Sequence, residues 1–229
     1  MTRKGLIIAI DGPSGAGKST ITRLLADRLG YVTIDTGAMF RAVALAARRG
    51  GIAADDAEGL SRLCREVVID LARTNGCCKV LLNGEDISRE IRTPEISSLT
   101  SKISAQKVVR DHLLALQRRM GAAGGVIMEG RDIGTVVFPD ADVKFFLSAS
   151  AEERGRRRYQ ELVAKGERLT LVETIAAVVE RDRQDSARAH APLKMAADAV
   201  EIDSTALTIE EVVARMAEIV AKRCQEKLG

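Results

Sequence analysis

The sequence predicts an α/β fold with a parallel sheet and a small inserted antiparallel sheet. Two patterns lead to this prediction. Strand and helix patterns alternate over residues 5–51, and two Asn-Gly turns separate short apolar runs within residues 67–88. The chain has 229 residues, a length that allows one domain or one domain with an insertion.

The first two strand–helix pairs lie near the N-terminus. Residues 5–11, Gly-Leu-Ile-Ile-Ala-Ile-Asp, form a continuous apolar run, which is typical of a strand buried on both faces of a parallel sheet. Residues 18–30 have the spacing of an amphipathic helix that ends at Gly30. A strand at 31–35 and a helix at 37–51 follow. This order predicts right-handed crossovers between parallel strands.

The pattern changes between residues 67 and 88. Asn75-Gly76 and Asn83-Gly84 lie between short apolar runs there, and such turns are hairpin signals. We therefore expect an antiparallel meander, followed by helices at 94–104 and 105–120.

Strand patterns return in the second half of the chain. Residues 126–130 and 142–148 are predicted strands, and residues 150–190 are helical and rich in arginine. A last strand at 199–203 precedes an amphipathic helix at 208–226.

The composition argues against several classes of protein. A formal net charge of +3 gives no argument for a nucleic-acid partner. The four cysteines show no CxxC spacing and there are two histidines, which argues against a zinc site. The apolar run near the N-terminus is too short for a signal peptide or a membrane span. We expect a cytoplasmic monomer that binds neither membrane nor nucleic acid.

The strongest motif is the phosphate clamp, residues 12–20. Gly12, Gly17, Lys18 and Ser19 match G-x-x-x-x-G-K-[ST], with a predicted strand before and a helix after. The alternative is a glycine-rich turn without a ligand. The residues expected to bind ATP are Gly12, Pro13, Ser14, Gly15, Ala16, Gly17, Lys18, Ser19 and Thr20.

The residue types of the clamp explain this chemistry. Backbone N–H groups at a helix N-terminus bind anions, and glycine lets the backbone curl around a phosphate. Lys18 supplies a positive charge for the β- and γ-phosphates, and the Ser19 hydroxyl suits Mg²⁺. The chain lacks the Asn-Lys-x-Asp stretch of guanine-reading GTPases. The clamp and the modest length together favour a compact kinase of a small molecule.

Candidate acceptor residues follow two other predicted strands. Arg131 and Asp132 lie where a parallel strand ends, a position that faces the ligand in open α/β sheets. The alternative is a surface Arg–Asp pair. Arg41 follows the strand at 31–35, although this stretch can also be an ordinary helix start capped by Asp35 or Thr36.

Two arginine-rich stretches complete the candidates. Arg181, Asp185 and Arg188 have the spacing of one helical face, which is either a binding face or a solvated ion-pair ladder. Four arginines within 154–158 repel one another unless an anion neutralises them. A polyphosphate would do so, and the alternative is solvation together with nearby glutamates.

Together these stretches resemble the bacterial cytidylate kinases, a family of nucleoside monophosphate kinases, over nearly the whole chain. The segments are Ile-Ala-Ile-Asp plus the clamp, Asp-Thr-Gly-Ala-Met-Phe-Arg at 35–41, Gly-Arg-Asp-Ile-Gly-Thr-Val-Val-Phe-Pro-Asp-Ala at 130–141, and Glu-Arg-Asp-Arg-Gln-Asp-Ser-Ala-Arg at 180–188. The segment at 130–141 is more specific to this family than the clamp.

The resemblance implies a three-layer P-loop kinase core with a five-stranded parallel sheet, a monophosphate-binding insertion and an arginine-rich lid. It assigns 1–62, 125–149 and 193–229 to the core, 63–124 to the insertion, and 150–192 to the lid and substrate helix. It also implies transfer of the γ-phosphoryl group of MgATP to CMP or dCMP.

The resemblance further implies roles for individual residues. Ser101, Arg110 and Asp132 would read cytosine, Thr36 would contact CMP, and Arg181 and Asp185 would hold the ribose. Arg41, Arg131 and Arg188 would hold the monophosphate. The residues expected to act in catalysis are Lys18, Arg131, Arg154, Arg158 and Arg188. Ser19 and, through water, Glu129 would serve Mg²⁺.

The chain departs from the family pattern at two positions. Phe40 stands where Tyr is common, and Glu129 stands where Asp is frequent. Two other functions are compatible with the clamp: a kinase of another small molecule, such as a sugar acid or shikimate, and a nucleotide sensor or nucleic-acid binder that uses residues 154–158.

Overall fold

In the computed structural model, which describes residues 5–74 and 77–228, two sheets organise the chain. Within this described part the larger sheet has five strands in the order β2-β6-β1-β7-β8, which confirms the predicted parallel core sheet. These strands are β1 (Ile7–Asp11), β2 (Val32–Asp35), β6 (Val126–Gly130), β7 (Val143–Ser148) and β8 (Val200–Asp203).

The chain divides into two compact units. Unit 1 comprises Met1–Thr33 and Ala123–Gly229, and unit 2 comprises Ile34–Ala122. The division by contacts therefore begins before residue 63, where the sequence places the start of the insertion. The extent of a monophosphate-binding insertion stays a prediction.

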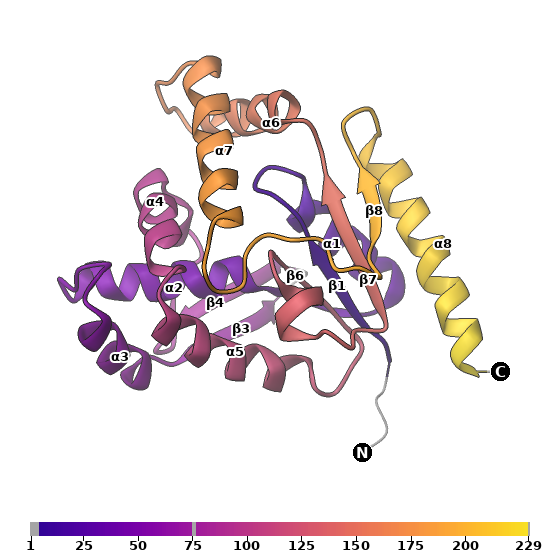
Figure 1. Cartoon of the computed structure of the whole chain (residues 1–229), viewed down its shortest axis with the longest axis horizontal. Helices are drawn as coiled ribbons and strands as arrows, with labels where there is room; N and C mark the ends of the chain where they lie inside the picture. The colour runs from indigo at the N-terminus through magenta and orange to yellow at the C-terminus, as the bar shows by residue number, and fades with distance from the viewer. Residues whose placement is uncertain (1–4, 75–76, 229) are drawn as a thin grey trace. The chain divides into compact units, whose positions relative to one another are not determined.

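Unit 1 has an aliphatic core between its sheet and two helices. All residues of β1 and β6 are buried, as their continuous apolar runs predict. The helices α1 (Lys18–Leu29) and α8 (Ile209–Leu228) pack on each other and against this sheet through residues such as Leu25 and Met216. Figure 1 shows α8 running beside β8.

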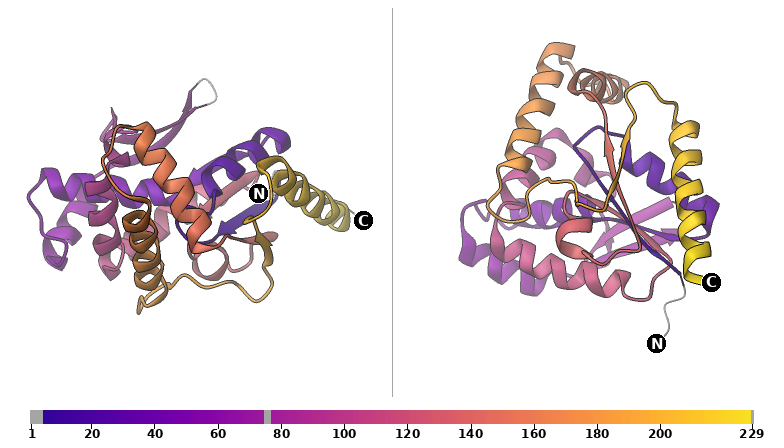
Figure 2. Two further views of the ribbon diagram at one scale, coloured as in Figure 1. Left: turned by 90° about the horizontal axis from the view of Figure 1, so that it is seen from above. Right: turned by 45° about the vertical axis from the view of Figure 1, so that its right-hand side comes forward.

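Two further helices of unit 1 pack against each other. They are α6 (Ala151–Ala164) and α7 (Leu171–Ser186), which appear side by side in Figure 1 and again in Figure 2. Thr170 and Glu173 form a capping box at the start of α7, which explains why the helix begins there.

Unit 2 is built around α2 (Thr36–Arg49), an alanine-rich helix. The other elements are α3 (Ala57–Glu66), β3 (Ile69–Thr74), β4 (Cys77–Leu82), β5 (Glu85–Asp86), η1 (Glu90–Arg92), α4 (Pro94–Ile103) and α5 (Lys107–Gly121). Within the unit, α2 contacts the helices α3, α4 and α5, the 3-10 helix η1 and the strand β4.

The predicted meander is confirmed in unit 2. In the described residues β3, β4 and β5 form an antiparallel three-stranded sheet. Asn83 and Gly84 connect β4 to β5 with φ values of 51° and 84°, the left-handed conformations that a tight hairpin turn requires. The other predicted turn, Asn75-Gly76, lies outside the described residues.

No helix in the described part of the chain is both long and apolar enough to cross a bilayer.

Candidate active site

The phosphate clamp joins β1 to α1, and its glycines shape it. Gly12, Gly15 and Gly17 have φ values of 149°, 79° and 89°, which other residues rarely adopt. A Cβ on Gly12 would lie 2.0 Å from the carbonyl oxygen of Leu147, so only glycine fits beside β7. Among the described residues no side chain caps the N-terminus of α1, and its first N–H groups can therefore bind an anion.

Lys18 folds back over the clamp. Its Nζ donates to two carbonyl oxygens at the start of the clamp, those of Gly12 and Pro13, both at 2.7 Å. Burial lowers the pKa of Lys18 to about 7, and the positive charge of Arg131 acts in the same direction. A polyphosphate in the clamp would oppose this shift, because its negative charge favours the protonated ammonium group.

Ser19 and Glu129 bring two oxygen groups together beside the clamp. The Ser19 hydroxyl donates to Oε2 of Glu129 at 3.1 Å, and the glutamate is buried near the end of β6. Hydroxyl and carboxylate oxygens are the donors that Mg²⁺ prefers. The two residues that were predicted to serve Mg²⁺ thus have suitable chemistry and lie within hydrogen-bond distance of each other.

The acceptor candidates of unit 1 form a buried ion cluster. Arg131 Nε donates to Oδ2 of Asp185 at 2.8 Å, and Arg188 Nη2 donates to the other carboxylate oxygen. The side chain of Asp185 is 1% exposed, that of Arg131 17% and that of Arg188 9%. Burial alone would raise the pKa of Asp185, but three arginines, Arg181 among them, lower it.

This cluster corrects one prediction about α7. The helix ends at Ser186, so the predicted helical face through Arg188 is wrong. Arg188 instead reaches Asp185 from the irregular segment that follows the helix. The alternative of a solvated ion-pair ladder is wrong as well, because Asp185 is buried and its partner Arg131 is 54 residues away in the sequence.

The arginines at 154–158 all have carboxylate partners, so the expected need for a polyphosphate is wrong. The alternative prediction, neutralisation by nearby glutamates, is confirmed for three of these arginines. An aspartate neutralises the fourth. The pairs are Arg154–Asp182, Arg156–Glu153, Arg157–Glu153 and Arg158–Glu161.

Arg154 is the buried member of this group. It donates to Asp182 on α7 at 2.6 Å, to the carbonyl oxygen of Ser14 in the clamp at 3.1 Å, and to that of Ala149 at 2.8 Å. It therefore ties α6 to both the clamp and α7. The direct action of Arg154 and Arg158 on a transferring phosphoryl group stays a prediction.

In unit 2, Arg41 and Thr36 lie in the first turns of α2. Asp35 caps this helix by accepting from the N–H of Ala38 at 2.9 Å, as the ordinary reading of this stretch predicted. The same carboxylate accepts from Arg41 Nη2 at 2.9 Å. The cap and the arginine candidate are thus compatible, because Asp35 uses one oxygen for each.

The two remaining candidates of unit 2 lie on neighbouring helices, Ser101 on α4 and Arg110 on α5. Arg110 is buried, and its Nη1 donates to the carbonyl oxygen of Ser104 at 2.9 Å. Its guanidinium carbon lies 5.3 Å from the centre of the Phe40 ring, within the range of a cation–π contact. Phe40, one of the two residues at which the chain departs from the family pattern, therefore contacts a candidate base reader.

Two residues of this region, Asp11 and Asp182, were not among those predicted from the sequence. Asp11 ends an otherwise apolar strand directly before the clamp, and its polarity at that position was a usable signal. Asp182 lies between two arginines on α7, and only the structure shows that it binds Arg154.

A model of the protein family described as Cytidylate kinase matches residues 8–222. The chain belongs to the cytidylate kinase family. A cytidylate kinase of Geobacter sulfurreducens is 70% identical over 221 residues, which cover 96% of this chain and 95% of that protein. One of Carboxydothermus hydrogenoformans is 47% identical over 216 residues, with coverage of 94% and 97%.

The fold of this cytidylate kinase family member also resembles solved structures of low sequence identity. An uncharacterized protein from Eubacterium ventriosum superposes with a TM-score of 0.53 at 12% identity, covering 96% of this chain and 99% of that one. At this identity the likeness concerns the fold alone.

Proposed function

We propose that this chain transfers the γ-phosphoryl group of MgATP to CMP or dCMP, giving ADP and CDP or dCDP, in pyrimidine nucleotide metabolism. The observation on which the proposal rests is membership of the cytidylate kinase family over residues 8–222. The clamp supports a triphosphate donor, and the buried arginine cluster supports an anionic acceptor. We further propose that the enzyme is a cytoplasmic monomer.

The donor side of the reaction belongs to the clamp. Its N–H groups and Lys18 hold the β- and γ-phosphates of ATP, the lysine supplying positive charge where negative charge accumulates. Ser19 and Glu129 are the residues that would hold Mg²⁺, directly or through water. When bound, the ion would add charge stabilisation to the phosphates.

The acceptor side uses arginines rather than a general base. An oxygen of the CMP phosphate is already anionic and forms the new P–O bond, while the bond between the γ-phosphorus and the β–γ bridging oxygen breaks and its electrons leave with ADP. Catalysis then consists of positioning and charge neutralisation. Arg41, Arg131 and Arg188 bind the monophosphate in this proposal, and guanidinium groups suit it because they bind phosphate oxygens bidentately.

Arg181 and Asp185 are proposed to hold the ribose. In the structure Asp185 already orders Arg131 and Arg188, so a single carboxylate would prepare the phosphate site and contact the sugar. Arg154 and Arg158 are proposed to approach the transferring group, which requires each to leave its carboxylate partner.

Base selection follows from hydrogen bonding. Cytosine carries an N4 amino donor and acceptors at N3 and O2. Asp132 would accept from the amino group, and Arg110 together with Ser101 would bind the acceptors, with Thr36 close to the nucleotide. Uracil would place O4 against the carboxylate of Asp132, and such a mismatch costs roughly 3 kcal/mol, or about 100-fold in kcat/KM.

An ADP-release assay with CMP, dCMP, UMP and AMP tests this function. CMP and dCMP should exceed UMP and AMP in kcat/KM by about 100-fold. Lys18→Ala serves as the inactive control, because it removes the charge that holds the phosphates. Equal rates with all four monophosphates would overturn the assignment of a cytosine reader.

The same assay with a sugar acid or shikimate tests the alternative that the chain phosphorylates another small molecule. ADP release with one of these compounds, and not with CMP, would favour that alternative. Binding of RNA or DNA that weakens steeply with salt, without ADP release, would instead indicate a nucleic-acid binder.

A further inference from the structure

Asp11 joins two segments that are far apart in the sequence. It is the last residue of β1, directly before Gly12 of the clamp, and its side chain is buried. Its Oδ1 accepts from the N–H of Ile133 at 2.8 Å, and its Oδ2 accepts from the N–H of Gly134 at 2.7 Å. These N–H groups directly follow Arg131 and Asp132, the proposed acceptor residues.

The carboxylate of Asp11 gains its stabilisation from these two bonds. Burial raises its pKa to about 6, while the bonds from Gly134 and Ile133 lower it and the nearby charges of Asp132 and Lys18 act in opposite directions. At neutral pH the group is therefore mostly ionised and accepts from both N–H groups. Bonds of this charge-assisted kind are stronger than neutral ones and fix geometry.

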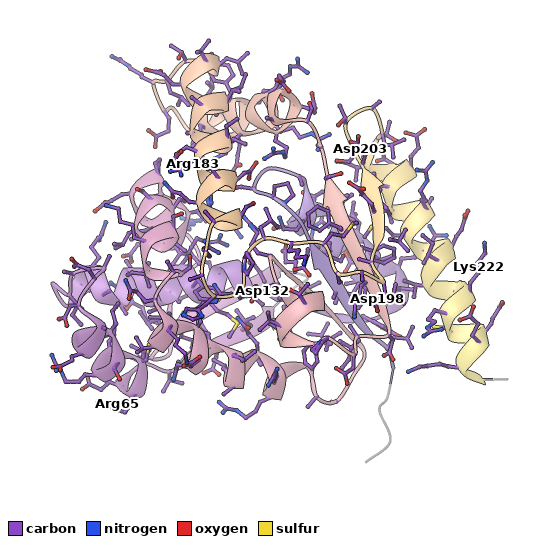
Figure 3. All side chains as sticks on the ribbon, in the orientation of Figure 1. Arg65, Asp132, Arg183, Asp198, Asp203 and Lys222 are labelled. Atoms are coloured by element: carbon purple, nitrogen blue, oxygen red, sulfur yellow. The ribbon has the colours of Figure 1, made fainter. Side chains whose placement is uncertain are left out.

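The segment that Asp11 holds is also fixed from other sides. A Cβ on Gly134 would lie 3.1 Å from Cδ of Lys144, a tight contact, and 3.4 Å from Oδ2 of Asp11, an ordinary one, so the loop lies close to both side chains. Lys144 on β7 donates to the carbonyl oxygen of Pro139 and to Asp198, which is labelled in Figure 3.

The carbonyl group of Asp132 is fixed as well. It accepts from the N–H groups of Val136 and Val137 at 2.9 and 3.2 Å within η2 (Ile133–Val137), a single π-helical turn. Turns of this kind are frequent at functional sites. The carbonyl oxygen of Asp132 and the N–H groups of Ile133 and Gly134 therefore all have hydrogen-bond partners. Asp11 is the partner of the two N–H groups.

We propose that Asp11 is a positioning residue that sets the backbone of residues 131–134 against the end of β1 and thereby holds Arg131 and Asp132 ready for the acceptor nucleotide. It touches neither nucleotide. Because the carboxylate is one residue from the clamp, it couples the geometry of the donor and acceptor sides. The role in catalysis rests on the proposed function, whereas the effect on the loop does not.

Asp11→Asn is the first test. The variant keeps one acceptor oxygen but turns an NH₂ group toward a backbone N–H, so one bond is lost and two donors face each other. We expect the KM for CMP to rise about tenfold or more and kcat to fall. The Kd for ATP alone should change less than about threefold, because the clamp keeps its glycines and Lys18.

Asp142→Asn is the matched control. Asp142 lies at the other end of β1, where its Oδ2 accepts from the N–H of Ile7 at 2.7 Å and its Oδ1 from Lys227. Like Asp11→Asn, the control removes a buried carboxylate that accepts from a backbone N–H group. Asp142, however, contacts the start of β1, whereas the clamp follows the end of β1. It should lower the Tm without raising the KM for CMP. An equal rise in KM in both variants would overturn the proposal, because it would reflect lost stability.

Gly134→Ala tests the same loop without changing charge. The added methyl group would lie 3.1 Å from Cδ of Lys144 and 3.4 Å from Oδ2 of Asp11, so the Lys144 side chain must give way by a few tenths of an ångström. We expect this crowding to disturb the loop and to raise the KM for CMP in the same direction as Asp11→Asn, by a smaller factor. This variant also covers the case in which Asp11→Asn fails to fold. A KM for CMP within twofold of the wild type in folded Asp11→Asn overturns the positioning role. If that variant does not fold, a Gly134→Ala protein whose Ile133 amide exchanges faster but whose KM for CMP is unchanged overturns it.

Hydrogen exchange separates this proposal from the proposed function. In nucleotide-free protein the amides of Ile133 and Gly134 should exchange at least tenfold faster in Asp11→Asn than in wild type or Asp142→Asn. Unchanged exchange overturns the inference even if CMP is the substrate. If CMP is not phosphorylated by the wild type, faster exchange still supports the control of the loop by Asp11.

Discussion

At the scale of single residues, the candidate site consists of charges held away from bulk water. Lys18, Glu129 and Asp185 are buried, and each has a charged or polar partner within the protein. Burial makes the protonation of such groups sensitive to an arriving charge. Binding of a nucleotide should therefore be accompanied by measurable movement of protons.

Proton uptake on ATP binding is the first prediction at this scale. With a pKa of about 7, Lys18 is mostly neutral at pH 8 in the free protein. The phosphates favour the ammonium form, so binding at pH 8 should be accompanied by net proton uptake. Calorimetry in two buffers with different ionisation enthalpies measures this uptake. Lys18→Met should abolish the difference between buffers, and a wild type without uptake would contradict the prediction.

Asp185→Asn is the second prediction. It leaves Arg131 and Arg188 without their shared carboxylate, and loss of one partner from a buried ion cluster costs roughly 3 kcal/mol of unfolding free energy. Urea denaturation at pH 7 measures this loss. Asp27→Asn, which removes an exposed pair with Arg23, is the control and should have little effect.

The effect of Asp185→Asn should depend on pH in a defined direction. Because the pKa of Asp185 is lowered in the folded state, its stabilisation is present above about pH 4 and is lost as the pH falls through the lower folded-state value. Wild type and variant should therefore converge in stability below pH 4. A constant difference across this range would contradict the assignment.

Residue spacing predicted some of these contacts and could not predict others. The clamp has fixed spacing because its N–H groups, lysine and hydroxyl are local, so the motif located Lys18 and Ser19. Arg131, one of the partners of Asp185, lies 54 residues away from it, and the partners of Asp11 lie more than 120 residues away. No local pattern encodes such pairs, because they depend on which distant segments pack together in the folded chain.

At the scale of elements, Arg154 connects α6, α7 and the clamp. Its position explains why an arginine-rich helix is stable: one arginine is buried among carbonyl groups and a carboxylate, and the others pair with glutamates on the same helix. The sequence predicted helical structure here but not the end of α7, since nothing in the periodicity marks Ser186 as a boundary.

Asp182→Ala tests the connection between α6 and α7. It removes the 2.6 Å ion pair with Arg154, whose side chain is 7% exposed, and should cost about 2 kcal/mol of unfolding free energy. Hydrogen exchange in both helices should accelerate. Glu180→Ala, on the same helix, removes an exposed pair with Arg183 and an exposed hydrogen bond from Gln184, and should leave exchange nearly unchanged. Equal effects of the two substitutions would argue against a structural role for Arg154.

At the scale of the whole molecule, the chain consists of two compact units that are joined near residues 33 and 122. The proposed phosphate and base ligands come from both units, for example Arg131 from one and Arg110 from the other. Because a phosphoryl transfer must exclude water, we predict that binding of both nucleotides makes the molecule more compact.

Small-angle scattering tests this closure. ATP with a non-reactive γ-phosphate and CMP together should reduce the radius of gyration by more than either compound alone, because each nucleotide engages groups that the other does not. Lys18→Ala, which weakens ATP binding, should reduce the effect of the pair to that of CMP. A radius of gyration that is unchanged with both nucleotides would contradict closure.

The sheet order has a consequence for synthesis of the chain on the ribosome. β1 occupies the centre of its sheet, and its two neighbours are β6 and β7, which end at residues 130 and 148. The apolar segment Leu6–Ile10 therefore emerges more than a hundred residues before the strands that flank it. During that interval the nascent polypeptide exposes an apolar, aggregation-prone β-strand segment. We therefore expect chaperone binding to be most important for this N-terminal segment.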